Sequence, residues 1–76
     1  MTTQEQLTLA REMARRIVAR FQPRAVLLFG SLASDAATPD SDADLLVVMQ
    51  FTGRRRDAVL AMLRECADLG LAKDIF

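Results

Sequence analysis

The amino-acid sequence predicts a small α+β domain in which helices flank a small mixed β-sheet. Two segments with apolar residues at helical spacing enclose two short apolar runs of strand length, and a third short apolar run closes the chain. A chain of 76 residues has the size of one domain, and at this size a protein buries only about 60% of its unfolded surface. We therefore expect residues 1–76 to form a single domain with the element order helix, strand, strand, helix, strand.

The first element is predicted to be a helix that ends before Pro23. Thr2-x-x-Glu5 and Thr3-x-x-Gln6 are alternative capping boxes at its start. Proline disfavours helical backbone at the residue before it, so Pro23 sets the end of the helix. The apolar residues recur at spacings of three and four and form one stripe, consisting of Leu7, Ala10, Met13, Ala14, Ile17, Val18 and Phe21.

Residues 25–29 are predicted to form the first strand. All five are apolar, so we expect this strand to be buried on both faces. Gly30 ends the run, residues 31–34 are expected to make a helical turn, and residues 35–41 form a loop that contains Pro39.

The second half of the chain is predicted to be strand, helix and strand. The second strand covers residues 43–49, and Gly53 breaks the chain before a helix over residues 54–69. We expect Gly70 to cap that helix at its C-terminus and a last strand over residues 71–76. The apolar side of the helix is expected to consist of Val59, Leu60, Leu63, Cys66, Ala67 and Gly70.

Composition excludes several kinds of chemistry. With one cysteine and no histidine, the chain has neither a disulfide framework nor a Cys/His zinc site. It also lacks the imidazole base that would activate Cys66 or Ser31 as a nucleophile, and we expect Cys66 to lie in the core. The 10 basic and 10 acidic residues give a formal net charge of zero, so direct nucleic-acid binding is not indicated. We expect solvated positions for the arginines, namely Arg11, Arg15, Arg16, Arg20, Arg54, Arg55 and Arg56.

Hydrophobic residues make up 51% of the chain, which is high for so small a domain. We therefore expect some apolar surface to contact a partner or a second copy of the chain. The N-terminus lacks the basic and then apolar pattern of a signal peptide, and no run approaches the roughly 20 apolar residues of a membrane span. A cytoplasmic location without a membrane partner is the expectation.

The most informative pattern is a Gly-Ser turn that is followed by an Asp-x-Asp pair at the start of the second strand. Because side chains alternate across a strand, Asp42 and Asp44 share a face, with Cα atoms roughly 6.5–7 Å apart. Carboxylates in this arrangement supply oxygen ligands for a hard divalent cation. Gly30 and Ser31 bring backbone N–H groups and a hydroxyl close to an anion such as phosphate. Together these residues predict a site for a metal-bound nucleoside triphosphate.

A solvated loop ahead of a buried strand is the structural alternative for the acidic residues. It accounts for Asp40 better than for Asp44, because Asp44 adjoins the apolar run. The order of strand, Gly-Ser, short polar loop and Asp-x-Asp is more specific than either pair of residues alone.

Residues 30–33 (GSLA) and 40–47 (DSDADLLV) resemble the signature of the minimal nucleotidyltransferases. These proteins belong to the DNA polymerase β-like superfamily and are often encoded beside a HEPN-domain partner, as the antitoxin of a toxin–antitoxin pair. The family pattern is approximately Gly-Ser-x-Ala-Arg-Gly, a short spacer and Asp-Ser-Asp-x-Asp-Leu, and the spacing here matches it over residues 26–49. Ser34 stands where the family usually has Arg, and Asp35 where it usually has Gly.

The resemblance implies a nucleotidyltransferase (polymerase β-like) fold and transfer of an NMP, AMP from ATP or the equivalent from another NTP, to an acceptor hydroxyl. Asp42, Asp44 and Asp74 would be the catalytic and metal-binding residues, with Mg²⁺ or Mn²⁺ as the cofactor. Gly30 and Ser31 would bind the nucleotide. The resemblance further implies a HEPN-type partner protein that this chain neutralises as an antitoxin.

Asp74 corresponds in this resemblance to a third carboxylate on the following strand. The alternative is an acidic residue that blunts a sheet edge. The chain ends at Phe76, two residues after Asp74, where family members usually continue. A C-terminally truncated form and a domain whose missing elements a partner supplies are both compatible with this end.

Two other functions remain open. A catalytically decayed nucleotidyltransferase-fold module would bind and neutralise a partner without chemistry, and Ser34 and Asp35 favour it. The three retained carboxylates argue against it. A structural α+β domain with an accidental Asp-x-Asp is the third possibility.

Overall fold

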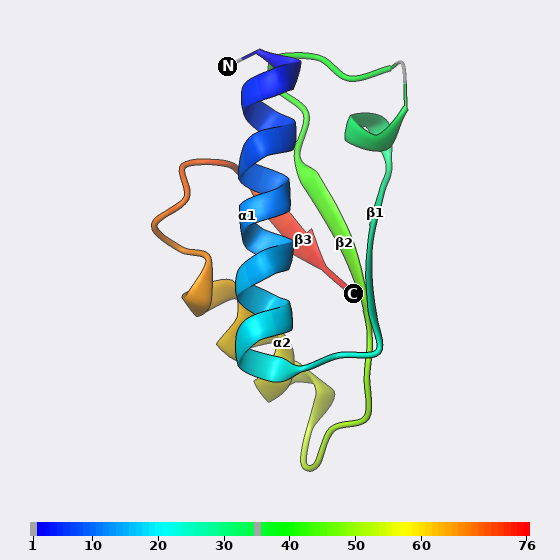
Figure 1. Cartoon of the computed structure of the whole chain (residues 1–76), viewed down its shortest axis with the longest axis vertical. Helices are drawn as coiled ribbons and strands as arrows, with labels where there is room; N and C mark the ends of the chain where they lie inside the picture. The colour runs from blue at the N-terminus through cyan, green and yellow to red at the C-terminus, as the bar shows by residue number, and fades with distance from the viewer. Residues whose placement is uncertain (1, 35) are drawn as a thin grey trace.

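The computed structural model of the chain describes residues 2–34 and 36–76. Its helices and strands follow the expected order, and the expected helical turn is a short 3-10 turn (Figure 1). In chain order the elements are α1 (Thr3–Phe21), β1 (Ala25–Phe29), η1 (Ser31–Ala33), β2 (Ala43–Val48), α2 (Arg55–Glu65) and β3 (Lys73–Ile75). The α+β class is confirmed. Asp35, the first residue of the expected loop, lies outside the described residues.

In the described part of the chain, β2 is the central strand of a three-stranded sheet with the order β1-β2-β3. It pairs antiparallel with β1 and parallel with β3, so the sheet is mixed. The buried residues of α1 and α2 belong to the same cluster as those of β2 and β3, which places both helices against one face of the sheet. This core comprises Ala10, Met13, Ile17, Leu32, Ala43, Leu45, Met62, Cys66, Leu71 and Ile75.

The opposite face of the sheet, called the outer face below, exposes large apolar side chains. Leu27 of β1 is 52% exposed, and Leu46 beside it on β2 is 39% exposed. The expectation that β1 is buried on both faces was therefore wrong. An uninterrupted apolar run cannot reveal that both described helices pack on the same side. The exposed apolar residues of the outer face are Leu27, Phe29, Leu46, Val48 and Phe76.

Local interactions set both ends of α1. The Thr2 hydroxyl accepts a hydrogen bond from the backbone N–H of Glu5 at 3.1 Å and donates one to the Glu5 carboxylate, also at 3.1 Å. The pair Thr2 and Glu5, rather than Thr3 and Gln6, thus caps the helix. At the other end Gln22 adopts a left-handed backbone with φ 51°, and its N–H donates to the Val18 carbonyl at 3.1 Å.

The helix α2 is shorter than the sequence suggested. It ends at Glu65, with Cys66 as its C-cap, so the expected cap at Gly70 was wrong. Met62 is buried, whereas Leu60 is 41% exposed, so the buried side of α2 is centred on Met62 and Cys66. The burial of Cys66 is as expected, and burial raises the pKa of its thiol.

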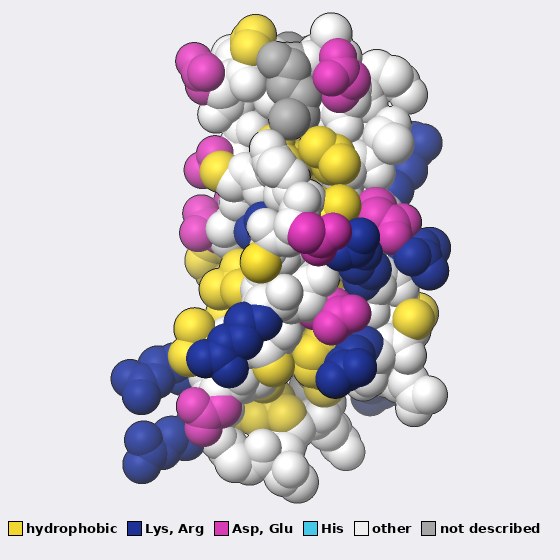
Figure 2. All heavy atoms as spheres, turned by 90° about the vertical axis from the view of Figure 1, so that its left-hand side faces the viewer, with side chains coloured by type: hydrophobic (Ala, Val, Ile, Leu, Met, Phe, Trp, Pro, Cys, Tyr) yellow, Lys and Arg dark blue, Asp and Glu magenta, His cyan; other side chains and the backbone are white. Residues whose placement is uncertain are grey.

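Ion pairs join the two helices on the surface. Arg16 of α1 donates to the Asp68 carboxylate at 2.5 Å, to Glu12 at 3.2 Å and to the Glu65 carbonyl at 3.1 Å. The hydrogen bonds to Asp68 and Glu12 raise the pKa of Arg16, and the bond from Arg16 lowers the pKa of Asp68. Acidic and basic side chains lie next to one another over much of the face drawn in Figure 2. No helix among the described residues is both long and apolar enough to cross a bilayer.

Candidate functional site

The strand register brings two of the predicted site residues together. Asp44 of β2 is paired with Asp74 of β3 and, on its other side, with Phe29 of β1. Neighbouring strands lie about 4.7–4.9 Å apart, and directly paired residues point to the same face. Asp44 and Asp74 are therefore neighbours on the outer face, although they are far apart in the sequence.

Asp42 lies on the same side of the chain as Asp44. Ser41, Ala43 and Leu45 are buried at 8%, 0% and 1% exposure. Asp42, between the first two, is exposed, and Asp44, between the last two, is partly buried. This alternation points both carboxylates away from the core, as the Asp-x-Asp spacing predicted.

Gly30 places the Gly-Ser turn directly against Asp44. Its φ of 76° and ψ of −160° belong to a backbone region that is essentially restricted to glycine. A Cβ at this position would collide with Oδ2 of Asp44 and lie 3.2 Å from its Cγ. The turn and the carboxylate can approach this closely only because residue 30 has no side chain.

The hydroxyl of Ser31 connects the turn to the loop that precedes Asp42. Ser31 Oγ donates to Ser41 Oγ at 3.0 Å, and the Thr38 N–H donates to the same Ser41 oxygen at 2.8 Å. The hydroxyl of Ser34, in place of the family arginine, donates to the Ser31 carbonyl at 3.1 Å. In this arrangement Ser31 must turn away from Ser41 if its hydroxyl is to donate to a phosphate.

Sequence reasoning missed the role of Gln6, which holds the loop next to this site. Its side chain is fully buried, and Nε2 donates to the carbonyls of Thr38 at 2.9 Å, Pro39 at 3.2 Å and Ser41 at 3.3 Å. A signal was present, because Gln6 stands four residues before Ala10 and thus occupies a core position of the helical stripe.

The carboxylates do not form a closed metal cage. Within residues 2–34 and 36–76, no three Asp, Glu, His or Cys side chains lie close enough together to hold one ion. Mg²⁺, however, is usually bound by one or two carboxylates together with substrate phosphates, rather than by protein ligands alone. The paired aspartates and the adjoining Gly-Ser turn fit that mode of binding.

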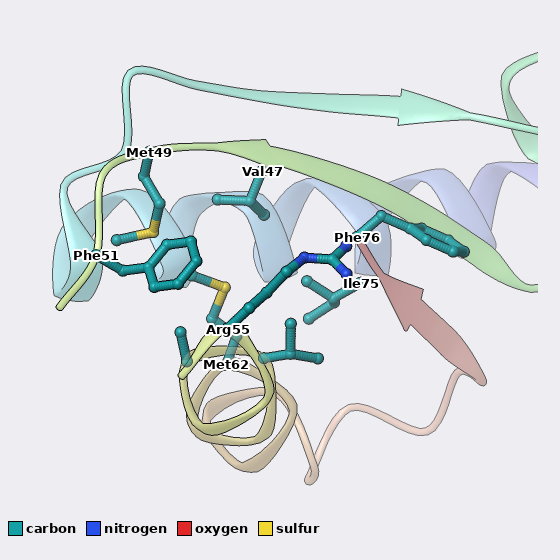
Figure 3. A pocket seen from close by; sticks show the side chains of 9 residues that line it. Val47, Met49, Phe51, Arg55, Met62, Ile75 and Phe76 are labelled. Atoms are coloured by element: carbon teal, nitrogen blue, oxygen red, sulfur yellow. The ribbon is translucent and has the colours of Figure 1, made fainter. Parts of the chain in front are cut away.

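An apolar hollow lies on the other side of β2 and β3 from the carboxylates (Figure 3). Arg55 is its charged lining residue, and the predicted site residues are not part of its wall. Phe76 borders both sides, because the centroid of its ring also lies 5.4 Å from that of the Phe29 ring on the outer face. The wall consists of Val47, Met49, Phe51, Arg55, Ala58, Val59, Met62, Ile75 and Phe76.

Comparison with known protein families decides the class of this chain. The profile described as "Nucleotidyltransferase domain" matches residues 10–74, which is most of the chain. The chain belongs to the nucleotidyltransferase domain family. The match includes the Gly-Ser turn and the Asp-x-Asp pair and ends at Asp74. No curated protein and no solved structure matches the chain.

The nucleotidyltransferase fold expected from the sequence is therefore confirmed, and the reaction class is transfer of a nucleotidyl group. In this nucleotidyltransferase domain, the end of β1, the turn η1 and the start of β2 meet at one end of the sheet, where β3 pairs with β2. The residues that carry the resemblance lie at this end of the sheet.

Proposed function

We propose that this nucleotidyltransferase domain transfers the NMP of a Mg²⁺-bound NTP, AMP from ATP, to an acceptor hydroxyl. The observation that carries the proposal is the close packing of Gly30 against Asp44, with Asp74 in register on the other side of Asp44. These observations support the proposal, because the Gly-Ser turn lies against Asp44, a carboxylate on the open face of the sheet.

Asp42 and Asp44 hold the cation, Mg²⁺ or Mn²⁺, in this proposal. When bound, the cation neutralises the triphosphate and the charge that develops on the leaving pyrophosphate. Gly30 allows the phosphates to approach the backbone closely, and the Ser31 hydroxyl donates to a phosphate oxygen. The absence of histidine is compatible with this chemistry, because carboxylates perform the acid–base work.

Asp74 positions the acceptor in the transfer step and takes up the proton of its hydroxyl. The acceptor oxygen forms a bond to the α-phosphorus as the bond between that phosphorus and the bridging oxygen breaks. Pyrophosphate leaves with the electron pair. The role of Asp74 rests on its position beside Asp44.

The acceptor in this proposal is a hydroxyl on a HEPN-type toxin, which the domain neutralises as an antitoxin. The resemblance of the motif to the minimal nucleotidyltransferases supports this acceptor. The exposed apolar residues of the outer face, such as Leu27 and Leu46, lie on the same side of the sheet as Asp44 and offer a contact surface for a protein substrate.

The test is transfer of label from α-labelled ATP to the protein encoded by the neighbouring gene, in the presence of Mg²⁺. We expect Asp42→Asn and Asp44→Asn to abolish transfer and Mg²⁺-dependent nucleotide binding without unfolding the protein. Asp40→Asn, in the exposed loop just before the Asp-x-Asp pair, is the matched control and keeps both activities. Equal nucleotide affinity in the wild type and both site variants would refute the assigned roles.

Asp74→Ala in the same assay examines the third carboxylate. We expect transfer to be lost while nucleotide affinity falls only slightly, because an interaction made mainly in the transition state affects turnover more than ground-state binding. If Asp74 only blunts the sheet edge, the variant transfers label like the wild type, and its stability changes by about 0.5 kcal/mol or less.

A decayed module that binds its partner without chemistry is the second candidate. Ser34, which stands where the family usually has Arg, favours this candidate, because in the resembled family that arginine would be a phosphate contact or an anchor of the loop. Binding of the partner by the wild type and by Asp42→Asn alike, with label transferred by neither, would select this candidate.

A further inference from the structure

Gln6 is a buried polar residue that lies outside the motif but holds the loop next to it. The side chain is 0% exposed. Its Nε2 donates to three carbonyl oxygens, those of Thr38, Pro39 and Ser41, at 2.9, 3.2 and 3.3 Å. An amide NH₂ group has two N–H donors, so the loop curls around a single nitrogen and the three carbonyls share its two protons.

The loop held in this way leads directly into the predicted metal ligands. Within the loop, the Ser41 N–H donates to the Thr38 carbonyl at 3.0 Å, and the Thr38 N–H donates to Ser41 Oγ at 2.8 Å. Ser31 of the Gly-Ser turn donates to the same Ser41 oxygen at 3.0 Å. Asp42 follows Ser41 in the chain. The residue that Gln6 holds therefore adjoins the first carboxylate in the chain, and it accepts the hydrogen bond of Ser31 until that hydroxyl turns to a phosphate.

Packing alone does not explain a glutamine at this position. Gln6 continues the stripe of Ala10, Met13 and Ile17, where an apolar side chain would be the ordinary choice. Among the described residues Gln6 Oε1 is buried without a hydrogen-bond partner, and burying an unpaired polar atom is unfavourable. The hydrogen bonds from the Gln6 amide to the loop offset the unfavourable free energy of burying the unpaired oxygen.

We propose that Gln6 is a positioning residue for nucleotidyl transfer, whose amide holds residues 38–41 so that Asp42 faces the metal-bound nucleotide. The inference rests on the proposed function. Gln6 acts through the loop, and it contacts neither the nucleotide nor the reacting atoms. Residues that orient metal ligands from outside the ligand set typically change metal affinity or activity by about 10- to 100-fold when they are replaced.

The experiment compares Gln6→Met, which keeps the length of the side chain but removes its donors, with Met13→Ala, which disturbs the core on the same helix away from the loop. Each variant is studied at a temperature at which circular dichroism shows it to be folded. We expect faster amide hydrogen exchange at Thr38 and Ser41 in Gln6→Met. We also expect its affinity for Mg²⁺-ATP and its rate of label transfer to fall about 10- to 100-fold. Met13→Ala lowers the thermal midpoint but leaves exchange at these amides, affinity and transfer unchanged.

Three results would overturn the inference. Unchanged exchange at Thr38 and Ser41 in Gln6→Met would show that the amide does not hold the loop. Faster exchange with wild-type affinity and transfer would reduce Gln6 to a structural role. A wild type that neither binds Mg²⁺-ATP nor transfers label would refute the proposed function itself, and the role of Gln6 in transfer with it. If Gln6→Met does not fold, Gln6→Asn, in which the amide is withdrawn by one methylene, replaces it in the same comparison.

Discussion

Gly30 meets two separate requirements at one position in the chain. Its backbone conformation, with φ 76°, strongly disfavours any residue with a side chain. In addition, the space in which a Cβ would lie is filled by the carboxylate of Asp44. Gly53 has a comparable φ of 82°, but nothing lies within 4 Å of its Cβ position. Alanine substitutions at the two glycines therefore distinguish the cost of backbone strain, which both would carry, from the collision with Asp44, which only residue 30 would cause.

We predict that Gly30→Ala and Gly53→Ala both lower the free energy of unfolding, by about 1–3 kcal/mol for the backbone strain. Only Gly30→Ala should also weaken Mg²⁺-ATP binding, because the added methyl group displaces Asp44. Urea denaturation measures the stability and calorimetry the affinity. Loss of nucleotide binding in both variants, or in neither, would contradict the role given to the contact between Gly30 and Asp44.

At the scale of elements, Arg16 connects α1 to the end of α2. It bonds Asp68 and the Glu65 carbonyl across the helix pair, whereas its neighbour Arg15 bonds, among the described residues, Glu12 on its own helix. Hydrogen bonds from Arg15 and Arg16 hold the pKa of Glu12 at about 2, below its ordinary value of 4.5. Acidic groups with lowered pKa values stabilise the folded state above their unfolded pKa, and this contribution is lost as the pH falls through the folded pKa.

We predict that Arg16→Met lowers the thermal midpoint at neutral pH more than Arg15→Met does, because Arg16 bonds Asp68 and the Glu65 carbonyl as well as Glu12, whereas the bonds of Arg15 to described residues stay within α1. The difference between the wild type and Arg16→Met should shrink as the pH falls from about 4.5 to about 2, since Glu12 becomes protonated in this range. Protonation of Asp68, whose pKa Arg16 also lowers, acts in the same direction. Thermal melts across this pH range provide the measurement. A difference that is constant with pH would show that the packing of the Arg16 side chain, rather than its charge, joins the helices.

At the scale of the whole molecule, the outer face is unusual because it exposes several large apolar side chains to solvent. Leu27 and Val48 are 52% and 42% exposed there, on the side of the sheet opposite α1 and α2. Apolar residues gathered on one face are typical of a protein–protein contact. This agrees with the expectation, from the 51% hydrophobic content, that the chain contacts a partner or a second copy.

We predict that the isolated chain self-associates at micromolar concentration and that Leu46→Lys, on the outer face, weakens this association. Val18→Lys replaces a residue of α1 that is 50% exposed and should leave association unchanged. Sedimentation velocity over a range of concentrations measures the effect. A wild type that stays monomeric and does not bind the neighbouring gene product would remove the outer face as a contact surface.

The sequence by itself determined the order of the elements, the α+β class and the residues of the motif. These features follow from local patterns: the period of apolar residues in α1, the apolar runs of β1 and β2, and the break at Pro23. The Asp-x-Asp pair was likewise readable, because alternation along one strand is enough to place Asp42 and Asp44 on one side.

Only the tertiary structure decided which side of each element is buried and which distant residues meet. It exposed one face of β1, centred the buried side of α2 on Met62 and placed Asp74 beside Asp44. It also set Gly30 against Asp44 and turned the amide of Gln6 onto the loop at residues 38–41. The physical reason is that periodicity reports only on near neighbours in the chain. Strand register and the side on which a helix packs depend instead on contacts between residues that are far apart in the sequence.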